Sequence, residues 1–136
     1  MVDAGVKNGV ITAETARLED TIQKEITQKN FVRAVMLAQK LDYPKSEIRY
    51  LQELALKQMA CEYRNGIAVR NLAREWGFSH VDLENLLRAA LEEYEKNSEK
   101  KRLVQCYDAS SGKYLTLRQW IEQFLKAKDK SVKHLS

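Results

Sequence analysis

The feature that most constrains this chain is its shortage of helix-breaking residues. Pro44 is the single proline, and only five glycines occur among 136 residues. Because Gly and Pro are the chief helix breakers, their scarcity favours long helices joined by short turns. Hydrophobic residues make up 44% of the chain and charged residues 31%, which is typical of a globular protein and too apolar for a disordered one.

Apolar residues at helical spacing predict five helices before residue 97. The expected ranges are 12–29, 31–41, 44–64, 67–76 and 79–96. Asn30 and Ser79 are placed to cap the second and fifth of these, and Asp82 stands three residues after Ser79 as in a capping box. Asn65 and Gly66 are expected to end the third helix, with Gly66 in the left-handed conformation.

The pattern changes after residue 97. Two short β-prone runs predict a hairpin over 102–117. Thr116 and Gln119 have the spacing of a capping box for a last helix, and from Lys126 onward we expect a fraying end with a basic tail at 129–136. The predicted fold is mainly α: a compact bundle of five to six helices with helix-turn-helix-like hairpins and one short β-hairpin near the C-terminus. It is expected to form a single domain over 12–128, behind a loose lead-in at 1–11.

One segment, 67–96, has the side chains that a helix–tight turn–helix needs. Ala73 sits where two helices must approach closely, and Gly77 sits four residues later, where the turn needs a positive φ. Five large apolar residues would close the small core between the helices: Leu72, Trp76, Phe78, Leu83 and Leu86. On these residues the segment resembles helix-turn-helix (tri-helical) domains in general, and no particular family.

An earlier segment, 31–60, repeats this outline. Ala38 lies 35 residues before Ala73, and the apolar positions around the two alanines line up with the break between helices at the same point. A true repeat implies stacked helical hairpins, although two units are fewer than solenoids usually need. The sequence leaves open whether the echo is a true repeat or a chance agreement between amphipathic helices.

The resemblance implies a second helix that enters the DNA major groove. Asn85 and Arg88 can read base edges, but Asp82 and Glu84 would face a polyanion, so the earlier copy offers the better reading helix. The candidate nucleic-acid contacts are polar or basic residues of the two second helices and of the hairpin: Lys45, Arg49, Gln52, His80, Asn85, Arg88, Lys100, Lys101, Arg102 and Lys113. The leading hypothesis is a small DNA-binding transcriptional regulator. The sequence leaves open whether it forms a homodimer.

The alternative is a helical adaptor that contacts another protein without binding nucleic acid. The net charge of +4 can be assigned to the segment from Lys113 to Ser136, whereas the fifth helix is acidic. These two surfaces could pair with different partners, or with each other across a homodimer. Trp76, Trp120 and Phe124 are expected in the core.

Motifs for catalysis, cofactors or metals are missing from the sequence. It has no Gly-rich phosphate loop, no Gly-x-Ser-x-Gly and no His-Glu-x-x-His. Cys61 and Cys106 stand far apart, and two histidines add too few ligands for a zinc site. No apolar run reaches the roughly 18 residues of a membrane helix, and the start has no secretory signal. We therefore expect a cytoplasmic protein that is not an enzyme, with no cofactor, no metal and no membrane partner.

Overall fold

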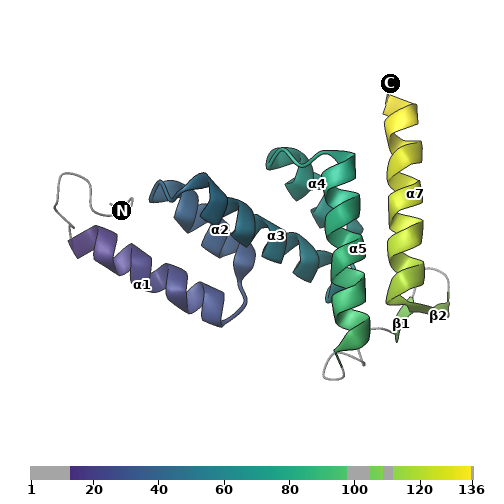
Figure 1. The fold of residues 1–136 in the computed structure, drawn as a ribbon, viewed down its shortest axis with the longest axis horizontal. Helices are drawn as coiled ribbons and strands as arrows, with labels where there is room; N and C mark the ends of the chain where they lie inside the picture. The colour runs from purple at the N-terminus through teal and green to yellow at the C-terminus, as the bar shows by residue number, and fades with distance from the viewer. Residues whose placement is uncertain (1–12, 98–104, 109–111, 136) are drawn as a thin grey trace. The chain divides into compact units, whose positions relative to one another are not determined.

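The computed structural model describes residues 13–97, 105–108 and 112–135 (Figure 1). These residues form six helices and two short strands: α1 Ala13–Thr27, α2 Phe31–Lys40, α3 Lys45–Cys61, α4 Gly66–Glu75, α5 His80–Lys96, β1 Gln105–Asp108, β2 Lys113–Thr116 and α7 Leu117–Leu135. The predicted mainly helical fold is confirmed, with one short hairpin near the C-terminus in which β1 pairs antiparallel with β2.

Contacts between residues divide the chain into two units, which are described separately. Unit 1 covers Met1–Ala55 and unit 2 covers Leu56–Ser136, so their boundary falls inside α3. The single domain over 12–128 stays a prediction.

Helices α2 and α3 are repeated by α4 and α5, with an offset of 35 residues at every boundary. The short helices begin at Phe31 and Gly66, and each has 10 residues. The long helices begin at Lys45 and His80, and each has 17 residues. The internal echo of the sequence is therefore also present in the backbone, as two copies of one helix pair.

The turn within each helix pair repeats as well. Asp42 has a φ of 60° in the first copy, and Gly77 has a φ of 77° at the matching place in the second. In the first copy the N–H of Tyr43 donates to the carbonyl of Ala38 at 3.0 Å. In the second copy the N–H of Phe78 donates to the carbonyl of Ala73 at 2.8 Å. This closure satisfies carbonyls at the helix end that would otherwise lack a partner. The predicted positive φ at Gly77 is confirmed.

The turn before each pair corrects one prediction. Lys29 and Arg64, again 35 residues apart, have φ values of 62° and 50°. The prediction that Gly66 ends α3 in the left-handed conformation is wrong, because Arg64 takes that conformation and Gly66 is the first residue of α4. A Cβ added to Gly66 would lie 3.2 Å from Cδ1 of Phe124. Glycine at this position therefore lets the Phe124 ring approach closely, and it does not serve a left-handed turn.

The predicted capping boxes are confirmed at two helices. At α5, the N–H of Asp82 donates to Ser79 Oγ at 3.0 Å and the N–H of Ser79 donates to Asp82 Oδ2 at 3.3 Å. At α7, Thr116 and Gln119 exchange the same two bonds at 2.9 and 3.1 Å. Asn30 is the N-cap residue of α2 as predicted, but its side chain makes no cap bond.

The core of unit 2 contains buried residues of both α4 and α5. Ala73 is fully buried, and Trp76 and Trp120 are partly buried against the core; the predicted close approach of the two helices at Ala73 stays a prediction. The buried cluster consists of Leu56, Ala60, Cys61, Val69, Ala73, Phe78, Leu83, Leu87, Ala90, Leu91, Tyr94, Leu117, Ile121, Phe124 and Leu125. The helix–tight turn–helix is thus confirmed as a packing arrangement.

In unit 1, α1 packs on α2. The buried apolar residues of this unit are Ile22, Ala34, Val35, Ala38, Leu51 and Ala55.

The end of the chain differs from the prediction in one respect. Helix α7 continues to Leu135, through the part that was expected to fray from Lys126. No Gly or Pro follows Gly112, so the sequence holds no breaker that would stop this helix.

Candidate functional site

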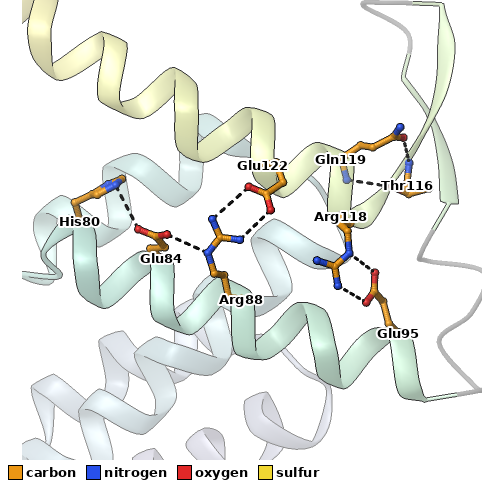
Figure 2. A network of polar contacts seen from close by, with 8 residues as sticks. All are labelled: His80, Glu84, Arg88, Glu95, Thr116, Arg118, Gln119 and Glu122. Atoms are coloured by element: carbon orange, nitrogen blue, oxygen red, sulfur yellow. Dashed lines mark hydrogen bonds and ion pairs between the residues drawn. The ribbon is translucent and has the colours of Figure 1, made fainter.

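Helices α5 and α7 are joined by two arginine–glutamate pairs (Figure 2). Arg88 of α5 donates to both carboxylate oxygens of Glu122 of α7, at 2.9 and 3.2 Å. Arg118 of α7 donates to both oxygens of Glu95 of α5, at 2.8 and 3.3 Å. The earlier α5 residue pairs with the later α7 residue, so the two helices run antiparallel. Two-pronged pairs of this kind fix geometry more than they add stability at an exposed surface.

Each of the three guanidinium nitrogens of Arg88 donates a hydrogen bond to a carboxylate. Its Nε donates to Glu84 Oε2 at 3.0 Å, in addition to the two bonds to Glu122. The hydrogen bond from Arg88 holds the pKa of Glu122 below its usual range, and the charge of Arg88 adds to the effect. Arg88 could therefore reach a base edge only by giving up bonds to two carboxylates.

The other predicted contacts on α5 lie near Arg88. His80 is the first residue of α5 and is half-buried, with Nε2 3.9 Å from Glu84 Oε1. Asn85 is exposed. The structure thus brings His80 and Arg88 together around Glu84, an acidic residue, as Figure 2 shows.

The predicted contacts on α3 differ in their exposure. Lys45 begins the helix and is exposed, and Arg49 is half-buried. Gln52 is only 6% exposed, so its side chain is not available for a surface contact.

The predicted hairpin contacts fall mainly outside the described residues. Lys100, Lys101 and Arg102 lie outside them, and Lys113 is the first residue of β2. DNA binding by the ten candidate residues stays a prediction.

Tyr94 links α5 to the residues that follow α3. Its hydroxyl donates to Glu62 Oε2 at 2.7 Å. Burial raises the pKa of Tyr94, and the bond to Glu62 raises it further. The phenol therefore stays protonated and serves as a fixed hydrogen-bond donor inside unit 2.

A groove that the sequence does not reveal lies between the start of α4 and the middle of α7. Its volume is about 280 Å³. One side is formed by Arg64, Gly66, Ile67 and Arg70. The other side is formed by Trp120, Gln123 and Phe124. We call this feature the α4–α7 groove.

Two aromatic rings on the α7 side form one continuous apolar wall. Trp120 and Phe124 stack with ring centroids 5.4 Å apart and an interplanar angle of 6°. The guanidinium of Arg70 lies over the Phe124 ring, 4.8 Å from its centroid, in a cation–π arrangement. Arg64 is held by a hydrogen bond, because its Nη1 donates to the carbonyl of Leu115 in β2 at 2.9 Å.

Sequence reasoning missed the groove because its α4 residues carry no motif. The sequence predicts Arg64 at the end of the third helix and Gly66 in the turn after it. It places Ile67 and Arg70 in the fourth helix and gives neither a binding role. Trp120 and Phe124 were expected in the core, and Phe124 is 5% exposed, yet both also line the groove. The one available signal is the comparison of the two copies, in which Gly66 and Arg70 replace apolar residues.

Within the described ranges, no three or more His, Cys, Asp or Glu side chains gather in a way that could hold a metal ion. In the same part of the chain, no helix combines the length and the apolar character that a bilayer span requires.

In comparisons with protein-family models, curated proteins and solved structures, no match to this chain was found.

Proposed function

We propose that this chain is a helical-repeat adaptor that binds another protein. The observation that carries the proposal is the 35-residue offset between the two helix pairs, which holds for the helix boundaries and for the turns. Two-helix repeats of about this length bury their apolar faces by stacking, and the stack presents an extended surface for binding.

The alternative, DNA reading by the second helix of a pair, has less support. On α5, Arg88 is bound to Glu84 and Glu122. On α3, Gln52 is buried. A reading helix must present its outward side chains to the major groove. Arg88 and Gln52 do not meet this condition, although Asn85 and Lys45 are exposed.

Exposed apolar side chains indicate where a partner would be found. Among the residues whose side chains the structure describes, five large ones are between 61% and 72% exposed: Met36, Tyr50, Tyr63, Ile67 and Val81. Single exposed apolar residues are ordinary on a monomer. Large apolar and aromatic side chains also anchor protein interfaces when a partner buries them, so these five are the positions to probe.

A photo-crosslinking scan tests the proposal. A photoreactive phenylalanine analogue is placed at each of the five positions in the full chain, with Arg74 as an exposed polar control position on α4. We expect at least one apolar position to give a discrete protein adduct that the Arg74 position does not give. The purified partner should then form a complex of defined mass with the chain by light scattering.

A salt titration with random duplex DNA provides the opposing outcome. Binding driven by phosphate contacts is strong at low salt and falls steeply as salt rises. Such binding, combined with no protein adduct at any of the five positions, would contradict the adaptor and favour the DNA-binding alternative.

A further inference from the structure

We infer that the α4–α7 groove binds an acidic peptide segment of a partner, in which a carboxylate lies beside an apolar side chain. The inference rests on the proposed function, since it names the chemistry of the partner that the adaptor binds.

The charge of the groove selects an anion. Arg64 and Arg70 are the only charged residues among those that line it. Helix α4, which begins at Gly66, has no acidic residue in its first turn. The positive end of the helix dipole therefore adds to the two arginines without opposition from a carboxylate in that first turn.

Arg70 has unused hydrogen-bonding capacity. Within the described residues its Nε is buried and has no acceptor. Its contact with the Phe124 ring orients the guanidinium without using an N–H. A carboxylate that accepts from this guanidinium would form the charge-assisted bonds that arginine makes best.

The walls and the size of the groove call for an apolar side chain next to that carboxylate. Ile67 is 72% exposed at the groove, and the Trp120–Phe124 stack lies on the other side. The volume of about 280 Å³ is at or below the lower end for small-molecule pockets, roughly 300 Å³. The groove therefore has room for a few side chains of a peptide.

The first copy of the helix pair supports this assignment as an internal control. At the positions of Gly66 and Arg70 it has Phe31 and Val35, and Val35 is fully buried. The second copy thus departs from the first where it lines the groove. Gly66 allows the close approach of Phe124, and Arg70 supplies the charge.

A nucleic-acid strand fits this groove less well than an acidic peptide. Proteins that bind single strands need cations along several successive phosphates together with stacking platforms. Here two arginines line one short groove, and the arginines that join α5 to α7, Arg88 and Arg118, are bound to glutamates.

Peptide titration followed by nuclear magnetic resonance tests the inference on the full chain. The probe is a blocked octapeptide with Glu-Phe-Glu at its centre and glycine and serine on both sides. Two matched peptides replace the glutamates with glutamine or the phenylalanine with alanine. We expect only the Glu-Phe-Glu peptide to shift both the Arg70 Nε–H signal and the Trp120 indole N–H signal.

Matched variants locate the binding. Arg70→Gln should weaken the affinity by at least about tenfold, the loss expected for a hydrogen bond to a charged group. Arg74→Gln removes an exposed arginine from the same helix and should leave the affinity unchanged. Ile67→Ser changes an exposed residue, so it tests the apolar wall even if Arg70→Gln disturbs folding, and it should also weaken binding.

Four results would overturn the inference: no shift at millimolar peptide, equal binding of the glutamine peptide, equal losses for Arg70→Gln and Arg74→Gln, or tighter binding of a single-stranded oligonucleotide at the same signals. Failure of the inference alone is recognised when the crosslinked partner still forms its complex with Arg70→Gln. Failure of the proposed function is recognised when no protein partner is found and duplex DNA binds.

Discussion

The two helix pairs, α2–α3 and α4–α5, have matching helix lengths and turns and different surfaces. Their boundaries and turns agree at an offset of 35 residues, while Phe31 and Val35 of the first become Gly66 and Arg70 of the second. These changes occur where the second pair meets α7 and lines the groove. The shared helix lengths and turns reflect how each pair folds. The residues that differ between the copies indicate where the second copy has a different function.

The charges on the long helices show the same contrast. The first copy has Arg49 followed four residues later by Glu53, whereas the matching positions of the second copy are Glu84 and Arg88. A glutamate that precedes its arginine by four residues is the better orientation on a helix. In the second copy this order also places Arg88 where it reaches Glu122 of α7. The reversed order of glutamate and arginine on α5 is therefore consistent with the packing of α5 against α7.

The largest expected loss of stability comes from substitutions that test whether the two copies pack in the same way. Ala38 and Ala73 occupy matching positions and are both fully buried. Replacing either with leucine should overpack a helix crossing and lower the free energy of unfolding by about 1–3 kcal/mol, as measured by urea unfolding. Ala89→Leu, at an exposed position on α5, is the control and should have little effect. If only one of the two variants at buried positions lost stability, the two copies would not pack in the same way.

A smaller effect is expected at the turns, where the copies use different residues for the same conformation. A Cβ at Gly77 would have no atom within 4 Å, so Gly77→Ala should cost about 1 kcal/mol from its positive φ alone. Asp42→Gly should raise the melting temperature modestly, since Asp42 adopts a φ of 60° that glycine reaches without strain. Thermal unfolding measures both variants. An unchanged melting temperature for Gly77→Ala would show that residue 77 does not need a positive φ in the folded protein.

The smallest effect concerns the charge pair that only the second copy can make. Arg88→Gln should return the pKa of Glu122 toward its ordinary value, because the hydrogen bond that lowers it is lost. A carboxyl whose pKa is lowered in the folded state stabilises that state above its unfolded pKa, and this contribution disappears as pH falls through the folded pKa. The stability difference between wild type and variant should therefore be present at neutral pH and shrink in acid. A carboxyl-detected titration of Glu122 checks the shift, and Arg74→Gln should leave it in place.

Local features could be predicted from the sequence. The capping boxes at Ser79 and Thr116, the positive φ at Gly77 and the packing of Ala73 each depend on residues close together in the chain. For the same reason, the predicted helix ranges agree with the observed ones to within a few residues over most of the chain.

The parts that could not be predicted depend on contacts between distant residues. Arg64 reaches Leu115 across 51 positions, and Arg88 reaches Glu122 across 34. Periodicity places Phe124 in a core, but it does not indicate that the ring also borders a groove beside Gly66. A lone glycine after a helix indicates a turn. Only the contact between Gly66 and Phe124 of α7 shows that this position favours a residue without a side chain.

The agreement of the two copies in helix boundaries and turns has a consequence for protein engineering. Repeat proteins are often stabilised by averaging their copies into one consensus sequence. Averaging toward the first copy would introduce Phe at Gly66, where even a Cβ would lie 3.2 Å from the Phe124 ring. It would also introduce Val at Arg70, and so remove a cation from the groove. A consensus version of this protein should therefore keep the two copies different at these positions.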